Sequence, residues 1–240
     1  PEGSGSFGHM AIVPGDTMAQ AHIFHPQPDE NGQPLTLASP SVSTALSTWL
    51  TPSSDATLSV TDAGELPASL YNVAFSRRPQ TPASVADWKK LNDRIQCEEP
   101  DFPETHGLFL TSGCVILEPD DRVWLVHPSN AFAGIKTTFP KGRLEPGLTL
   151  AVNAVKETFE ESGLWVEPVA WLADIRRTKS ITRYYIARRT AGTPRDAGWE
   201  SQAVSLVPLS GLSAMLNMPN DRKVLPFLYT WLIRHGTLPV

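Results

Sequence analysis

Three glutamates, Glu157, Glu160 and Glu161, lie close together in the stretch GRLEPGLTLAVNAVKETFEESGL, residues 142–164. If residues 150–162 form a helix, Glu160 and Glu161 fall about 60° to one side and about 40° to the other side of Glu157. Three like charges on one helix face repel one another unless a cation lies among them. Mg²⁺ prefers carboxylate oxygens. The run therefore predicts a divalent metal site, with an ordinary solvated helix face as the alternative.

The residues around the acidic run favour the metal site. Pro140–Gly142 (Pro-Lys-Gly) precedes the expected helix, and Gly163 follows it, where a left-handed C-cap is expected. Val152, Val155 and Phe159 fall on the side away from the acids, so we expect them to face a core.

Residues 142–164 resemble the Nudix box, which reads Gly, five residues, Glu, seven residues, Arg-Glu, an apolar residue, any residue, Glu-Glu, any residue, Gly and an apolar residue. The residues in register are Gly142, Glu157, Glu160, Glu161, Gly163 and Leu164. The sequence departs from the box at Leu148 in place of Glu, Lys156 in place of Arg, and Thr158 in place of an apolar residue.

The resemblance implies that Glu157, Glu160 and Glu161 hold Mg²⁺ or Mn²⁺, while the missing Glu and Arg brace the loop and the helix. It implies hydrolysis of a phosphoanhydride bond in a nucleoside diphosphate-linked or polyphosphate compound, by water activated on the metals. Leu148 is expected to replace an ionic anchor with an apolar one, and Lys156 keeps the charge without the forked geometry of a guanidinium. Glu145 is a candidate substitute for the missing acid.

A carboxylate must accept the proton of the attacking water. The candidates are Glu160, Glu161 and Glu200, the last in the loop GWESQAV. Six of the fourteen residues from Arg176 to Arg189 are Lys or Arg, so we expect basic side chains to meet the phosphates. The predicted substrate contacts are Lys136, Lys141, Arg143, Arg183 and Tyr185, and the alternative is that these charges only protect a sheet edge.

Three functions remain open from the sequence, and the first is the metal-dependent hydrolase of a phosphoanhydride bond. The wider pattern looks most similar to the branch of the family that cleaves dinucleoside polyphosphates and diphosphoinositol polyphosphates, and ADP-ribose or nucleotide-sugar pyrophosphatase is the alternative substrate class. A ligand-binding or regulatory module with the same fold but weak catalysis is the second function, favoured by Leu148 and Lys156. The third is a structural protein with an acidic helix.

Strand-like and helix-like blocks alternate from about residue 106 onwards. Strands are expected at 108–118, 121–128, 165–178 and 180–190, and a last helix around 223–236. The pattern predicts an α/β domain at 106–240, which the resemblance makes a mixed sheet between helices. The first 105 residues hold 12 of the 22 prolines, so residues 10–105 are expected to be a loop-rich extension, with short strands at 57–60 and 71–75 and a helix at 85–95. This extension is expected to be a packing flap, an oligomer arm or a lid.

Composition limits the function further. Residues 1–9 look like a tag remnant, with a natural start at Met10, and no secretory signal or membrane span is evident. A net charge of −5 argues against broad nucleic-acid binding. Two cysteines are too few for a four-thiolate zinc site and fit a reducing cytoplasm. The resemblance also allows a homodimer.

Overall fold

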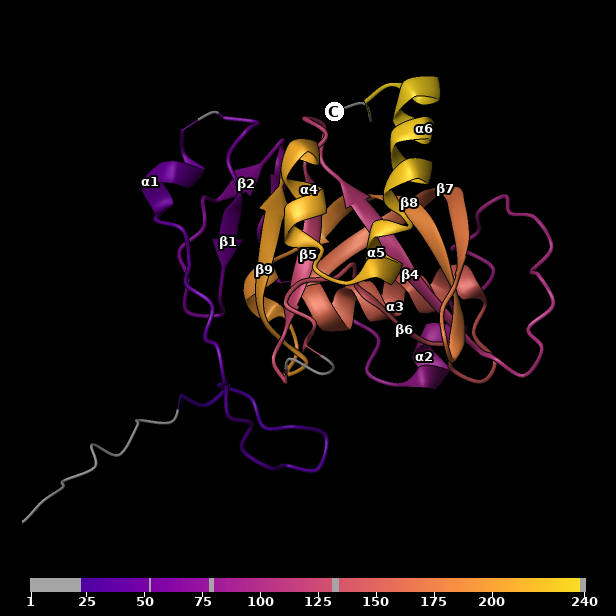
Figure 1. Ribbon diagram of the computed structural model, residues 1–240. Helices are drawn as coiled ribbons and strands as arrows, with labels where there is room; N and C mark the ends of the chain where they lie inside the picture. Colours follow the sequence, from indigo (N-terminus) through magenta and orange to yellow (C-terminus); the bar gives the residue numbers. More distant parts are fainter. Residues whose placement is uncertain (1–22, 52, 78–79, 131–133, 238–240) are drawn as a thin grey trace, which may run out of the picture.

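The computed structural model describes residues 23–51, 53–77, 80–130 and 134–237 (Figure 1). The tag-like residues 1–9 and the expected start at Met10 lie outside the described residues. The helices and strands are α1 (Leu46–Trp49), β1 (Leu58–Val60), β2 (Ser69–Leu70), β3 (Val73–Ala74), α2 (Val85–Lys89), β4 (Phe109–Leu117), β5 (Val123–Pro128), β6 (Lys141–Arg143), α3 (Leu150–Ser162), β7 (Leu164–Arg176), β8 (Ser180–Gly192), η2 (Pro194–Asp196), β9 (Ser201–Val207), α4 (Leu209–Met215), α5 (Pro219–Arg222) and α6 (Leu225–His235).

A mixed β-sheet forms the centre of the fold. Its strand order is β1-β9-β5-β4-β8-β7, and the short β6 pairs with β4. Strands β4 and β8 run parallel, from Phe109 opposite Ser180 to Leu117 opposite Arg188, while the other paired strands of this sheet are antiparallel. Among the described helices, none is long and apolar enough to span a bilayer.

Helices cover both faces of this sheet (Figure 1). Because successive residues of a strand point to opposite faces, Tyr185 of β8 joins the core under α3, and Tyr184 joins the core under α4 and α6. Both tyrosines are fully buried. The expected α/β fold, with a mixed sheet between helices, is confirmed.

The predicted helix 150–162 matches α3 at both ends. Val152 and Val155 are buried in the core under α3, and Phe159 packs against it, as their helical phase predicts. The four expected strands of the domain lie within a few residues of β4, β5, β7 and β8. Strand β6 was not predicted, because three residues are too few to show an alternating pattern.

The N-terminal extension shares the core of the sheet. Strand β1 pairs with β9 as an edge strand, placing Leu58 opposite Leu206. Trp49 stacks on Trp124 of β5, with ring centroids 6.1 Å apart, and Trp88 of α2 stacks on Trp165 of β7 at 5.3 Å. Aromatic pairs of this kind stabilise a fold beyond the area they bury. The extension is therefore a structural part of the domain.

Arg189 clamps the extension from within the sheet. Its guanidinium is buried, pairs with Glu118 at 2.6 Å, and donates hydrogen bonds to the carbonyl oxygens of Leu70 and Val73 at 2.8 and 3.2 Å. Glu118 also accepts a hydrogen bond from the indole nitrogen of Trp124 at 2.7 Å. A buried charge needs this many partners to offset its lost hydration. The hairpin β2–β3 is thus held by a cation of β8.

His127 of β5 joins the extension at a second place. Its Nε2 lies 2.7 Å from Ser205 Oγ, and its Nδ1 lies 3.1 Å from Ser41 Oγ of the extension. Burial lowers the pKa of His127 to about 4, so the ring is neutral near pH 7.

We predict that Arg189→Ala lowers the free energy of unfolding by about 3–5 kcal/mol, because it leaves Glu118 buried without its cation. Urea denaturation measures this loss. Arg188→Ala, on the neighbouring residue, is the matched control, since its pair with Glu167 is about half exposed and should contribute only about 0–1 kcal/mol. Equal losses in the two variants would contradict the clamp.

Candidate active site

Helix α3 carries the three box glutamates, and two caps fix its ends. The hydroxyl of Thr149 accepts a hydrogen bond from the backbone N–H of Val152 at 3.2 Å, which caps the first turn. Gly163 ends the helix with φ of 69°. A Cβ at Gly163 would lie 2.2 Å from the carbonyl oxygen of Thr193. Only glycine lets the end of α3 approach this loop so closely.

Gly142 of β6 lies directly against Glu157. A Cβ at Gly142 would meet Glu157 Oε2 at 1.8 Å, so any larger residue would displace this carboxylate. Strand pairing holds Gly142 opposite Ser112 of β4. This contact explains why a glycine is needed fifteen residues before the first glutamate of the helix.

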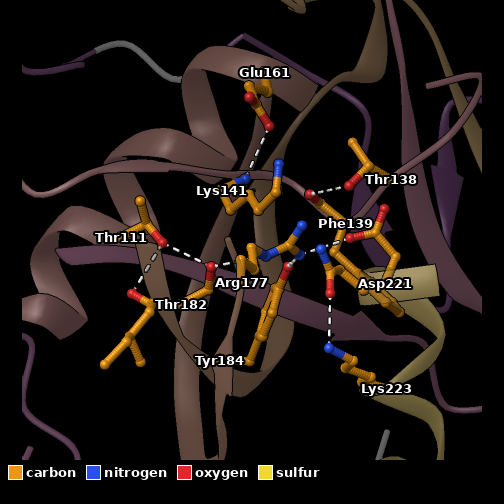
Figure 2. Close-up of polar contacts among 12 residues, drawn as sticks. Thr111, Thr138, Phe139, Lys141, Glu161, Arg177, Thr182, Tyr184, Asp221 and Lys223 are labelled. Carbon is orange, nitrogen blue, oxygen red and sulfur yellow. Dashed lines mark hydrogen bonds and ion pairs between the residues drawn. The ribbon is translucent and has the colours of Figure 1, made fainter. Parts of the chain in front are cut away.

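Glu161 is anchored by strand β6. Its Oε2 accepts a hydrogen bond from the backbone N–H of Lys141 at 2.9 Å (Figure 2). Burial raises the pKa of Glu161 to about 8 against the opposing effect of Lys141, and the charges of Glu157 and Glu200 raise it further. Glu161, Glu157 and Glu200 are therefore close enough to interact.

Lys156 lies between the other two box glutamates. Its Nζ is 2.6 Å from Glu160 Oε2 and 3.2 Å from Glu157 Oε1. Burial raises the pKa of Glu157 to about 7 although Lys156 opposes it, and the charges of Glu160 and Glu200 add to the rise. The lysine at the expected arginine position thus stays within the acidic cluster, as a single point charge.

The predicted Glu200 meets these residues in a cleft of about 550 Å³. Desolvation and then the charges of Glu160 and Glu30 raise the pKa of Glu200. The cleft is lined by Glu30, Glu145, Lys156, Glu157, Phe159, Glu160, Asp196, Gly198, Trp199 and Glu200. The structure places the predicted Glu200 near the box, and it adds Glu30, a residue of the N-terminal extension that the sequence did not indicate.

A divalent cation fits the chemistry of this donor set. No three acidic, His or Cys side chains of the described residues are already gathered as a metal-binding group. Carboxylate oxygens of Glu157 and Glu160 both contact the ammonium group of Lys156. This position between the two carboxylates can therefore accept a cation. Glu157 and Glu161, whose pKa values are raised first by burial and then by neighbouring acids, would be stabilised in their ionised form by a bound divalent ion.

The loop before α3 is braced without the missing acid and arginine. Leu148 is buried in the apolar core, as expected for an apolar anchor. Asn153 Oδ1 accepts a hydrogen bond from the backbone N–H of Glu145 at 3.0 Å. Asn92, from the extension, donates to the carbonyl oxygen of Gly147 at 2.9 Å and accepts from the N–H of Thr149 at 3.1 Å. Sequence reasoning missed both asparagines.

The structure does not bring Arg183 and Tyr185 to the acidic cleft. Arg183 is buried, with its guanidinium 2.7 Å from Asp174, 3.2 Å from Glu99 and 3.0 Å from the carbonyl oxygen of Pro100. The hydroxyl of Tyr185 donates to the same Glu99. The two side chains share a face, as the strand period predicts, but they bind the extension, so we do not retain them as phosphate contacts.

The remaining predicted contacts lie around the box. Lys141 has electrostatic interactions with Glu161 and Glu200, and it stays a candidate. Arg143 is exposed, and its guanidinium lies 4.1 Å from the ring centroid of Phe109. Lys136 is exposed, and its backbone N–H donates to Asn217 at 2.9 Å. Neither Lys136 nor Arg143 lines the cleft.

Sequence reasoning also missed a buried polar cluster next to β6. Arg177 Nη2 lies 2.6 Å from Asp221 Oδ1 and 2.8 Å from the hydroxyl of Tyr184 (Figure 2). Asp221 Oδ2 is buried and has no hydrogen-bond partner among the described residues. The charge of Glu161 helps to raise the pKa of Tyr184, after burial and Asp221, so this cluster lies close enough to Glu161 to interact with it.

The family model for the NUDIX domain matches residues 107–228, about half of the chain. The chain therefore belongs to the Nudix family. This range begins next to the predicted boundary at residue 106, includes the box and Glu200, and ends within the first turn of α6.

Two curated relatives share the name 8-oxo-dGDP phosphatase NUDT18. The Mus musculus protein is 33% identical over 106 residues, which is 42% of this chain and 33% of that protein. The Homo sapiens protein is 32% identical over the same length. The chain thus matches about a third of the length of these relatives. A solved NUDIX hydrolase from Nitrosomonas europaea is 19% identical, with a TM-score of 0.45 over 52% of this chain and 90% of that one.

We predict that the metal-free protein loses thermal stability as the pH rises from 6.5 to 8. The folded pKa values of Glu157 and Glu161, about 7 and about 8, lie above their ordinary value. The folded state then binds more protons than the unfolded state in this window, so stability falls with rising pH. His127 opposes this fall in part near pH 6.5, because its folded pKa is lowered to about 4 while an unfolded histidine still binds protons there.

Differential scanning calorimetry in a chelator measures this slope for the wild type and for Glu161→Gln. The glutamine variant should show a flatter fall, because it has no proton to lose. Glu167→Gln, at an exposed residue of β7, is the control and should keep the wild-type slope. Parallel profiles for wild type and Glu161→Gln would rule out the raised pKa.

Proposed function

We propose that the chain is a divalent-metal-dependent hydrolase that cleaves a phosphoanhydride bond in a nucleoside diphosphate-linked compound. One observation carries the proposal: in a member of the Nudix family, Glu157 and Glu160 of α3 line one cleft with Glu200, and the buried Glu161 interacts electrostatically with Glu157 and Glu200. Burial, with a further contribution from neighbouring carboxylates, raises the pKa values of Glu157, Glu161 and Glu200 although the nearby lysines oppose the rise. A bound divalent cation would stabilise the ionised form of these carboxylates.

Glu157, Glu160 and Glu161 would hold Mg²⁺ or Mn²⁺. The bound ion supplies charge neutralisation of the phosphates and a more acidic water. Gly142 leaves room for the carboxylate of Glu157, and the N–H of Lys141 orients that of Glu161. Lys156 would keep Glu157 and Glu160 near each other between turnovers.

Glu200 is the preferred general base, with Glu160 and Glu161 as the alternatives. A base works best when its pKa is near the working pH, and the pKa of Glu200 is raised by desolvation and by Glu160. Its place at the cleft, across from α3, lets it take a proton from a water molecule that the box residues orient.

Lys141 is the proposed phosphate contact, since it interacts with two of the acids and lies on β6 beside them. Lys136 and Arg143 remain candidates for a longer substrate that extends past the cleft. The arginines of β7 and β8 supported a polyphosphate substrate in the sequence, but Arg183 and Arg189 are internal clamps. Arg183 and Arg189 therefore give no support for a polyphosphate substrate.

A nucleoside diphosphate is the substrate class that we favour. The two curated relatives are named for action on an oxidised guanine nucleoside diphosphate. A short phosphate chain also suits a cleft where acids outnumber the lysines. ADP-ribose, nucleotide sugars and dinucleoside or inositol polyphosphates are the alternatives.

We place this activity in the cytoplasm, which fits the two free thiols, Cys97 and Cys114. A homodimer remains a prediction from the family resemblance.

The test is release of phosphate or nucleotide from dGDP, 8-oxo-dGDP, ADP-ribose, a diadenosine polyphosphate and a diphosphoinositol phosphate, with Mg²⁺ or Mn²⁺. Glu160→Gln and Glu200→Gln should each lower kcat by about 10²-fold or more with the best substrate, because each removes a carboxylate from the reacting centre. Glu167→Gln is the charge-matched control and should keep wild-type kcat. Full activity in Glu160→Gln would overturn the proposed site.

A further inference from the structure

A hairpin from the N-terminal extension, residues 24–36, lies next to the loop that carries Glu200. Phe24 and Thr36 form its β-bridge, and the N–H of His25 donates to the carbonyl oxygen of Leu35 at 2.7 Å. At the tip, Asp29 Oδ1 accepts hydrogen bonds from the N–H groups of Asn31 and Gln33 at 2.9 and 2.7 Å. The tip residue Glu30 is therefore held in an ordered turn.

Two side chains of the hairpin attach it on either side of Glu200. His25, which is buried, donates from Nε2 to the carbonyl oxygen of Ser201 at 3.2 Å. Gln27 Nε2 donates to the carbonyl oxygen of Ala197 at 3.2 Å. In Figure 1 the indigo hairpin lies at the end of the molecule where β9 begins. These bonds place the hairpin at the mouth of the acidic cleft.

Glu30 faces the candidate catalytic residues. It lines the cleft together with Glu157, Glu160 and Glu200, and its charge contributes to the raised pKa of Glu200. Among the described residues, Glu30 has no hydrogen-bond or ion-pair partner. The fold thus brings a further carboxylate, which has no ion-pair partner, from the N-terminal extension to a cleft that is already acidic.

The acids that line this cleft outnumber its cations. Glu30, Glu145, Glu157, Glu160 and Glu200 face a single lysine, Lys156, while Asp196 pairs with Arg77 at 3.1 Å. An extra negative charge strengthens the binding of a divalent cation and weakens that of a phosphate chain. Both effects grow with the charge of the ligand.

We propose that the hairpin 24–36 is a lid of the active site, in which Glu30 strengthens divalent-cation binding and selects against substrates with long phosphate chains. This inference rests on the proposed function. Glu30 acts through its charge, and the bonds of His25 and Gln27 fix the place from which it acts.

Mn²⁺ binding to the full chain, measured by isothermal titration calorimetry without substrate, tests the first part. Glu30→Gln should weaken Mn²⁺ binding by about three- to tenfold at low salt, and the difference should shrink at 0.5 M salt. Glu65→Gln removes an exposed charge elsewhere in the extension and is the control. Gln27→Ala keeps every charge but loosens the tip, so it should weaken binding in the same direction by a smaller factor.

Substrate selection tests the second part. In Glu30→Gln, kcat/KM for a nucleoside triphosphate should rise about three- to tenfold relative to that for the corresponding diphosphate. Glu65→Gln should leave this ratio unchanged.

Different outcomes would overturn the lid proposal and the proposed function. If wild type binds Mn²⁺ and Glu157→Gln loses it, while Glu30→Gln keeps wild-type affinity and an unchanged substrate ratio, the lid inference is overturned and the proposed site stands. If wild type neither binds Mn²⁺ nor cleaves any diphosphate compound, the proposed function fails, and the lid inference fails with it. Loss of Mn²⁺ affinity in Glu30→Gln with an unchanged circular dichroism spectrum supports the lid.

Discussion

Crowding of negative charge at the end of α3 is the constraint on which the arrangement of the site depends. Glu157 and Glu161 are held in surroundings that raise their pKa values to about 7 and about 8. The C-terminal end of a helix carries partial negative charge of its own, which adds to the cost. Three neighbours lower this cost. The N–H of Lys141 donates to Glu161, and the ammonium of Lys156 pairs with Glu157. Gly142, which has no side chain, leaves space for the carboxylate of Glu157. The pKa values of Glu157 and Glu161 remain raised in spite of them, and the divalent cation that we propose would stabilise the ionised carboxylates.

The positive charge of the same domain is used in a different way. The arginines of β8 point to carboxylates and to backbone carbonyl groups of the extension, as Arg183 does with Pro100 and Arg189 with Leu70. Arginine suits this task because its guanidinium has several donors in a fixed plane and stays charged when buried. A basic run in a sequence therefore does not identify an anion site until the partners of each side chain are known. Here the cations hold the chain together, and the acids face the cleft.

The sequence predicted those features that depend on local periodicity. The phase of α3, the cap at Gly163 and the long strands follow from spacing along the chain. The features that it did not predict depend on residues that are distant in the sequence and close in space. They are Asn92 at the box loop, Glu30 at the cleft, and the acids that pair with Arg183. Glu200 was found because a family pattern pointed to its loop. The sequence allowed a lid among the roles of the extension but did not show which of its residues reach the site, since proline-rich segments show no period that reports their contacts.

The loop before α3 is held partly by the extension, at the place where this chain departs from the Nudix box. Where the family pattern has an acid and an arginine to brace the loop, this chain has an apolar anchor at Leu148, an amide bond to Asn153 and two hydrogen bonds to Asn92. Asn92 belongs to the extension, so the loop that places Gly142 against Glu157 depends on residues outside the matched domain. Lys156, at the position of the box arginine, contacts the acids Glu157 and Glu160. The extension and the catalytic helix are therefore parts of one structural unit.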